Sequence, residues 1–218
     1  MTPGRDERPA HGDGPYNPLD KRHLGESVCE ALLRRPVQQL PPEGRVVGAG
    51  VYAIYYAGSF PLYSAIAARN REQRWEAPIY VGKAIPPGGR KGGVGVADSP
   101  VLSGRLQEHA ESVRQATNLD LADFACRFLI VDDIWIPLGE SLLIQQFEPV
   151  WNIALDGFGN HDPGSGRHKQ QRSPWDVLHP GRPWADRLQP NRRSLDEIVR
   201  EVGSFINRPT GDEPDPEQ

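Results

Sequence analysis

Three short apolar runs in the chain have the composition of β-strands. Residues 50–56 (Gly-Val-Tyr-Ala-Ile-Tyr-Tyr) and 77–82 (Ala-Pro-Ile-Tyr-Val-Gly) are rich in β-branched and aromatic side chains and are bounded by glycine or proline. Residues 124–131 are apolar and partly alternate with polar positions. Each run predicts one strand, and together they predict a small sheet.

Three further segments carry apolar residues at helical spacing. In residues 24–35, Val28, Leu32 and Leu33 fall on one side of a helix that ends before Pro36. The other two predicted helices span residues 103–115 and 139–147. Because apolar residues occupy one side of each segment, these helices are expected to pack on the sheet.

The order of these elements predicts the fold class. Strand, strand, helix, strand, helix is typical of an α/β (α+β) layer in which a three-stranded, mainly antiparallel sheet is flanked by helices. Residues 59–76 separate the first two strands and are long enough for a helix around residues 65–69 instead of a tight turn. Residues 83–99 are rich in glycine and proline and predict a flexible loop.

Size and composition narrow the class of protein. A chain of 218 residues with 37% hydrophobic content can bury one hydrophobic core, with additional segments packed around it. There is no apolar run of membrane-spanning length, and the first residues lack the apolar stretch of a signal peptide. We therefore expect a soluble, cytoplasmic protein without a membrane partner. Cys29 and Cys126 lie in apolar contexts without CxxC spacing and are interpreted as core residues.

The net charge of −4 conceals an uneven distribution of charge. Residues 157–193 hold seven Lys or Arg against three Asp, whereas residues 196–218 hold seven acidic residues against two Arg. A basic block therefore precedes an acidic C-terminal segment. Composition alone leaves open whether the basic block is a solvated surface or a phosphate-binding face.

Two pairs of polar residues suggest chemistry on a phosphodiester. Arg105 and His109 are four residues apart on a predicted helix, so they share one face. A guanidinium suits a phosphate, and an imidazole accepts a proton directly or through a neighbouring hydroxyl. Without other motifs, a solvated helix face would be the favoured interpretation of this pair. Tyr52 and Tyr80, one in each of the first two strands, are either half-buried sheet residues or reactive hydroxyls.

The motifs occur in the order of a known superfamily. Gly50-Val-Tyr-Ala-Ile-Tyr-Tyr, Ile79-Tyr-Val-Gly, Gly104-Arg-Leu-Gln-Glu-His, Gly139-Glu-Ser-Leu-Leu and Pro149-Val-Trp-Asn follow one another along the chain. This order resembles the GIY-YIG nucleases, with Val51 and Val81 where the motif name has isoleucine. The resemblance implies the GIY-YIG nuclease fold and makes residues 59–76 an insertion, which we expect to serve DNA binding or dimerisation.

The resemblance also implies roles for single residues. Tyr52 is the candidate general base, Tyr80 orients the scissile phosphate or the nucleophile, and Asn152 holds the geometry of the site. Glu140 is the candidate ligand of one Mg²⁺, with Mn²⁺ as another possible ion, because Mg²⁺ uses few protein carboxylates together with water and phosphate oxygens. Without the resemblance, Glu140 would be interpreted as a helix-capping carboxylate. The implied catalytic set is Tyr52, Tyr80, Arg105, His109, Glu140 and Asn152.

Within the superfamily the chain looks like a type II restriction endonuclease. It is short, and it lacks a separate helix-turn-helix or zinc DNA-binding domain. Residues 157–185 and 16–28 resemble restriction enzymes of this superfamily that cut the palindrome CCGCGG. Such enzymes act on double-stranded DNA as homodimers, and their host encodes a cognate DNA methyltransferase that is a genetic, not a physical, partner. Two alternatives remain: a structure-directed repair or homing-type nuclease, and a non-catalytic DNA-binding scaffold.

The resemblance leads to a division of the chain and a set of DNA contacts. The predicted parts are a disordered arm (1–15), an N-terminal helical extension (16–48), a catalytic core (49–156), a DNA-contacting or wrapping region (157–193), and a helix with an acidic disordered tail (194–218). Candidate contacts are Lys83, Arg90, Lys91, Arg167, His168, Lys169, Gln170, Gln171 and Arg172. For Lys83, a phosphate contact and a simple strand end remain equally open.

Overall fold

A computed structural model describes residues 17, 19–86, 99–164 and 169–208. Its sheet is antiparallel with the strand order β1-β4-β2-β3. The strands are β1 (Gln38–Gln39), β2 (Gly50–Tyr56), β3 (Pro78–Ala84) and β4 (Phe124–Ile130). The α/β fold class is confirmed, but the expectation of three strands is wrong. A fourth strand exists because the two-residue β1 pairs with β4 at the edge of the sheet.

Seven α-helices accompany the sheet in the part of the chain that is described. They are α1 (Lys21–Leu33), α2 (Ser64–Asn70), α3 (Val101–Gln115), α4 (Ile136–Phe147), α5 (Val150–Ile153), α6 (Pro174–Leu178) and α7 (Leu195–Ile206). Short 3₁₀ turns occupy Pro61–Tyr63, Leu121–Asp123, Asp133–Trp135 and Ala185–Arg187. Among the described residues, no helix combines the length and the apolar character needed to cross a bilayer.

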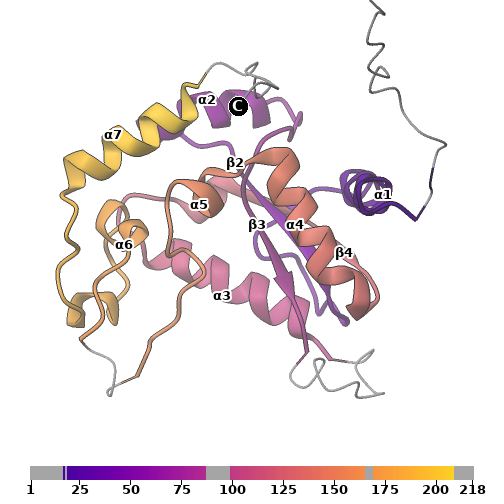
Figure 1. Ribbon diagram of the computed structural model, residues 1–218. Helices are drawn as coiled ribbons and strands as arrows, with labels where there is room; N and C mark the ends of the chain where they lie inside the picture. The colour runs from indigo at the N-terminus through magenta and orange to yellow at the C-terminus, as the bar shows by residue number, and fades with distance from the viewer. Residues whose placement is uncertain (1–16, 18, 87–98, 165–168, 209–218) are drawn as a thin grey trace, which may run out of the picture.

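The central strand β2 explains why helices lie on both faces of the sheet. All seven of its residues are buried. Because side chains alternate along a strand, Val51, Ala53 and Tyr55 face one way and Tyr52, Ile54 and Tyr56 the other. The first group packs with α1 and α4, and the second with α3, α5, α6 and α7. Figure 1 shows α1 and α4 on one side of the molecule and α6 and α7 on the opposite side.

All three predicted helices begin earlier in the structure than in the sequence analysis, and α3 begins at Val101 instead of residue 103. The helix expected at residue 139 begins at Ile136, with Pro137 in its first turn, where proline is well tolerated. The helix expected at residue 24 begins at Lys21, because the Asp20 carboxylate caps it by accepting from the Arg22 N–H. The earlier start of α4 matters for the site, since it moves Glu140 out of the first helical turn and excludes the capping interpretation.

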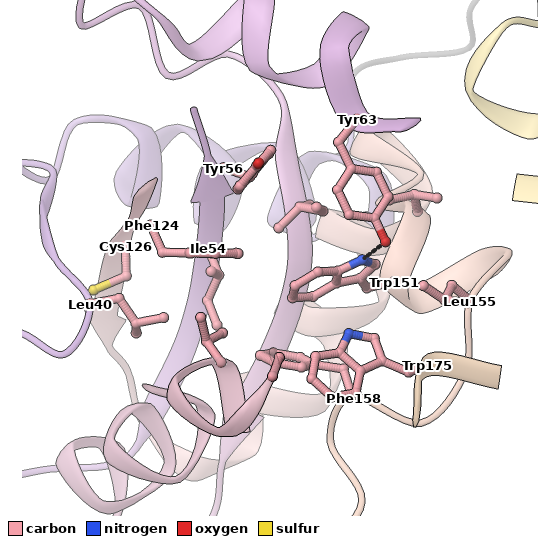
Figure 2. Close-up of a cluster of buried hydrophobic side chains, with 14 of the residues drawn as sticks. Leu40, Ile54, Tyr56, Tyr63, Phe124, Cys126, Trp151, Leu155, Phe158 and Trp175 are labelled. Carbon is pink, nitrogen blue, oxygen red and sulfur yellow. Dashed lines mark hydrogen bonds between the residues drawn. The ribbon is translucent and has the colours of Figure 1, made fainter. Parts of the chain in front are cut away.

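The insertion between β2 and β3 closes part of the core. It contains the helix that was expected around residues 65–69, now α2. Tyr63 is fully buried and accepts a hydrogen bond of 2.9 Å from Trp151 Nε1 (Figure 2). Its hydroxyl also lies 2.7 Å from His179 Nε2. The buried Asn70 amide bonds to the backbone of Tyr56 and Ala77. This part of the insertion therefore stabilises the fold, while a role in DNA binding or dimerisation stays a prediction.

The basic block of residues 157–193 is not a uniform exposed face. The Arg182 guanidinium is 1% exposed and pairs with Asp176 at 2.6 Å. Two exposed arginines also have acidic partners, since Arg187 pairs with Asp162 and Arg193 with Glu201. Intramolecular ion pairs therefore engage several basic side chains of this block, for which composition left open a solvated surface or a phosphate-binding face.

Candidate active site

The two tyrosine strands lie side by side, and glycine allows their hydroxyl groups to approach. Tyr52 of β2 is directly opposite Gly82 of β3 in the antiparallel register. A Cβ atom built on Gly82 would lie 2.4 Å from the Tyr52 hydroxyl oxygen. The glycine of the second motif therefore leaves the space in which the Tyr52 hydroxyl lies. The rings of Tyr52 and Tyr80 are 6.4 Å apart between centroids.

His109 completes this group from α3. Its Nε2 atom lies 2.6 Å from the Tyr52 hydroxyl oxygen, and its ring centroid is 5.1 Å from that of Tyr80. His109 is 1% exposed, which excludes the alternative interpretation that it lines a solvated helix face. Sequence spacing placed Arg105 and His109 on one face correctly, and the sheet brings that face against both tyrosines.

Burial determines the direction in which a proton can move in this group. Desolvation raises the pKa of Tyr52 far above its ordinary value, although the nearby Arg105 guanidinium lowers it in part. Desolvation, and then the charge of Arg105, hold the pKa of His109 well below its ordinary value. Since a neutral imidazole has one acceptor nitrogen, His109 Nε2 can accept a hydrogen bond from the Tyr52 hydroxyl.

Arg105 lies at the solvent side of the same group. Its side chain is 28% exposed, and its guanidinium contacts Glu108 at 2.7 Å and the His161 ring. A hollow of about 510 Å³ beside it is lined by Lys83, Arg105 and Glu108, among others. A phosphate placed in this hollow would meet a guanidinium that is already oriented.

Glu140 reaches the site from the opposite face of the sheet. Its carboxylate is 19% exposed and accepts a hydrogen bond of 2.5 Å from Lys83 Nζ. Because β3 is an edge strand, groups from both faces can meet around it. Desolvation is the main cause of the raised pKa of Tyr52 and of Tyr80, and the charge of Glu140 raises both further, so the carboxylate and the two hydroxyl groups share one electrostatic environment.

Asn152 holds the edge strand that carries Tyr80. Its side-chain oxygen accepts from the Val81 N–H and its side-chain nitrogen donates to the Val81 carbonyl, both at 2.8 Å. The amide thus replaces the backbone partner that an edge strand lacks. This agrees with the geometric role that the sequence suggested for Asn152.

The remaining predicted DNA contacts have different surroundings. Lys169, Gln170 and Gln171 are exposed, whereas the Arg172 guanidinium is engaged by the Ala185 carbonyl and by Asp186. The other four, Arg90, Lys91, Arg167 and His168, lie outside the described residues. The predicted arm of residues 1–15 and residues 209–218 of the predicted tail also lie outside them. No contact with DNA is tested by this structure, so the whole set stays a prediction.

The sequence analysis missed four residues at the site. Phe158, Gly159 and His161 come from a stretch without periodicity, and Gly82 was quoted only as part of a motif. Phe158 stacks on His109 with centroids 4.6 Å apart and an interplanar angle of 17°. The sequence signals for this stretch were the glycines around Phe158 and the resemblance of residues 157–185 to restriction enzymes of the superfamily.

Comparison with protein families identifies this arrangement. The model of the Eco29kI GIY-YIG domain matches residues 44–206, well over half of the chain. The chain belongs to the Eco29kI GIY-YIG family. This is a restriction endonuclease family, so the protein is a nuclease, a hydrolase whose substrate is DNA. The match includes α6 and α7, which were predicted to lie after the catalytic core. A comparison with curated proteins gave no match.

The residues of this GIY-YIG site fit a single divalent cation. Glu140 is a poorly exposed carboxylate that already holds one cationic group, the Lys83 ammonium. One carboxylate suits Mg²⁺, which otherwise uses water and substrate phosphate oxygens. Among the described residues, no group of three or more His, Cys, Asp or Glu gathers to form an all-protein metal cage.

Proposed function

We propose that the protein is a type II restriction endonuclease that hydrolyses a GC-rich palindrome in duplex DNA, CCGCGG, with one Mg²⁺ per active site. A homodimer would place one site on each strand of the palindrome. The observation that carries the proposal is the hydrogen bond from Tyr52 to the buried His109 beside Arg105, within the matched family. This arrangement provides a proton path next to a cationic phosphate site.

The proton path runs from water to His109. The Tyr52 hydroxyl donates its proton to His109 Nε2 as it takes one from the attacking water, so no free phenolate accumulates. This relay is required because burial raises the pKa of Tyr52 far above neutrality. Tyr80, on the neighbouring strand, orients the phosphate or the water, and Asn152 fixes the strand that carries it.

Arg105 and Glu140 serve to neutralise the negative charge of the substrate phosphate. The guanidinium of Arg105 binds non-bridging phosphate oxygens and stabilises the charge that develops on them. Glu140 would hold Mg²⁺, which when bound neutralises phosphate charge and stabilises the leaving alkoxide. The carboxylate must leave Lys83 to do so, and the released ammonium is then free to approach a phosphate.

Digestion of plasmid DNA tests the proposed function. Plasmids with and without CCGCGG are incubated with the full chain in Mg²⁺ or Mn²⁺, and the fragments are sequenced. Discrete fragments with ends at CCGCGG support a restriction enzyme, and elution as a dimer supports the two-fold arrangement. Structure-dependent nicking supports the repair or homing-type alternative. Binding without any cleavage in any divalent metal would contradict the enzyme proposal and favour the scaffold.

Removal of Lys83 is expected to strengthen metal binding in the absence of DNA. Lys83→Met leaves the Glu140 carboxylate without its ammonium partner, so a divalent cation no longer competes with it. We expect the affinity for Mn²⁺, measured by calorimetry, to rise roughly fivefold, the scale of a partly exposed ion pair. Lys21→Met, at an exposed helix end, is the control. Unchanged or weaker affinity in Lys83→Met would show that the two ions do not share Glu140.

A further inference from the structure

A short stretch after α5 forms one side of the active site. The Phe158 ring stacks on His109 and meets the Tyr80 ring edge-on, with centroids 5.0 Å apart. A Cβ atom on Gly159 would lie 3.0 Å from the Tyr80 hydroxyl oxygen and 3.9 Å from an Arg105 nitrogen. His161 contacts the Arg105 guanidinium. Residues 157–161, called here the wall, therefore touch His109, Tyr80 and Arg105.

Arg182 anchors the wall from within the protein. Its guanidinium lies over the rings of Trp175 and Trp184, at 4.5 and 4.6 Å from their centroids, and pairs with Asp176. It also donates to three backbone carbonyls of the wall: Gly157 at 2.9 Å, Phe158 at 3.1 Å and Asn160 at 3.2 Å. All of these contacts converge on one side chain that is 1% exposed.

A buried guanidinium fixes the backbone around it. Such a charge is costly to bury unless an ion partner and hydrogen-bond acceptors surround it, and here both are present. Movement of the wall would break the three hydrogen bonds that Arg182 donates to its carbonyls, so the wall is held rigidly. Gly157, at φ 115°, provides the left-handed turn that starts the wall, and Ser173 fills the space where a side chain would be.

We propose that the wall is a positioning element of the nuclease site, in which Phe158 and Gly159 set the places of His109 and Tyr80. This inference rests on the proposed function and deepens it. Phe158 and Gly159 touch catalytic side chains, not the substrate, and they act through them. The C-terminal region thereby contributes to catalysis as well as to the predicted recognition of DNA.

Phe158 acts by keeping water from the imidazole. The charged or titratable groups that face His109 are Tyr52 from β2, Tyr80 from β3, Arg105 from its own helix, His161 from the wall and Arg182. Exclusion of water is the main reason that a proton on His109 is disfavoured, and the charges of Arg105, His161 and Arg182 disfavour it further. The wall therefore keeps His109 neutral and able to accept the Tyr52 proton.

Phe158→Leu tests the effect on His109. Loss of the stacked ring admits water, so the pKa of His109 rises and the imidazole is protonated at a higher pH. The acid limb of the cleavage rate should move to higher pH by roughly half a unit or more. The imidazole titration followed by NMR in the DNA-free protein should move the same way. Phe124→Leu, in the same core but without contact to His109, is the control. It should change neither the acid limb of the cleavage rate nor the NMR titration of the imidazole.

Gly159→Ala tests the placement of Tyr80. The backbone of Gly159 is not left-handed, so alanine fits without backbone strain, but its Cβ displaces the Tyr80 hydroxyl by a few tenths of an ångström. We expect kcat to fall about tenfold or more while KM changes by less than about twofold. Gly203→Ala in α7 meets only Leu62 at 3.6 Å and should cut like the wild type.

The outcomes separate this inference from the proposed function. If the wild type cuts no DNA, the proposed function fails, whereas the NMR titration still tests the stacking of Phe158 on His109. If the wild type cuts, and both folded variants keep its kcat and its acid limb, the wall only stabilises the fold and the inference is overturned. Equal loss of activity and of thermal stability in Phe158→Leu and Phe124→Leu would also overturn it.

Discussion

Glu140→Gln is expected to lower the rate of DNA cleavage by about a thousandfold, which corresponds to about 4 kcal/mol of lost transition-state stabilisation. Glutamine keeps the size of the side chain and can still accept a hydrogen bond from Lys83. It removes the negative charge that a divalent cation requires. Cleavage kinetics in Mg²⁺ and calorimetric titration with Mn²⁺ measure the two effects, and both signals should be lost together.

A matched control exists on α7. Glu201→Gln also removes a carboxylate from an ion pair, with Arg193 at 2.6 Å, but this pair is exposed and lies outside the proposed site. Surface pairs of this kind contribute little to stability, so this variant should bind metal and cut DNA like the wild type. If Glu140→Gln cuts at the wild-type rate, the carboxylate does not hold the catalytic ion. If it binds Mn²⁺ normally but does not cut, the ion is held elsewhere.

The sheet shows what local pattern can and cannot predict. β2 and β3 were predicted because their apolar runs are continuous and bounded by glycine or proline. β1 could not be predicted, because Gln38 and Gln39 are two polar residues that become a strand only by pairing with β4, far along the chain. The predicted start of α4 at residue 139 was three residues late, because the buried Ile136 precedes Pro137, which lies in the first helical turn where proline is tolerated.

In the active site, too, local sequence pattern predicts which side chains share a face but not which of them are buried. Helical spacing was sufficient to place Arg105 and His109 on one face, and the structure puts that face against Tyr52. The spacing could not show that His109 is buried, since burial depends on Phe158 from another part of the chain. Arg182 was counted among basic surface residues, because neither composition nor periodicity indicates that Asp176 and two tryptophans surround it.

Tyr52→Phe is expected to lower the cleavage rate by roughly a hundredfold to ten-thousandfold, the usual contribution of a proton-transfer group. The substitution keeps the ring and its packing and removes only the hydroxyl that links water to His109 Nε2. It leaves a buried acceptor unpaired, which costs about 1–3 kcal/mol of stability. Single-turnover cleavage and chemical denaturation measure the two effects separately.

The fold itself supplies the control, because it contains a second buried tyrosine–histidine pair. The Tyr63 hydroxyl lies 2.7 Å from Nε2 of His179, whose pKa burial lowers to about 3, and the Nδ1 atom of His179 lies 2.9 Å from the Asn118 side-chain oxygen. Because Tyr63→Phe also removes the acceptor of Trp151 Nε1, it should lose at least as much stability as Tyr52→Phe and keep its cleavage rate. If both variants lose activity in proportion to stability, the hydroxyl of Tyr52 has no chemical role. If Tyr52→Phe alone becomes slow, the hydroxyl carries the proton to His109.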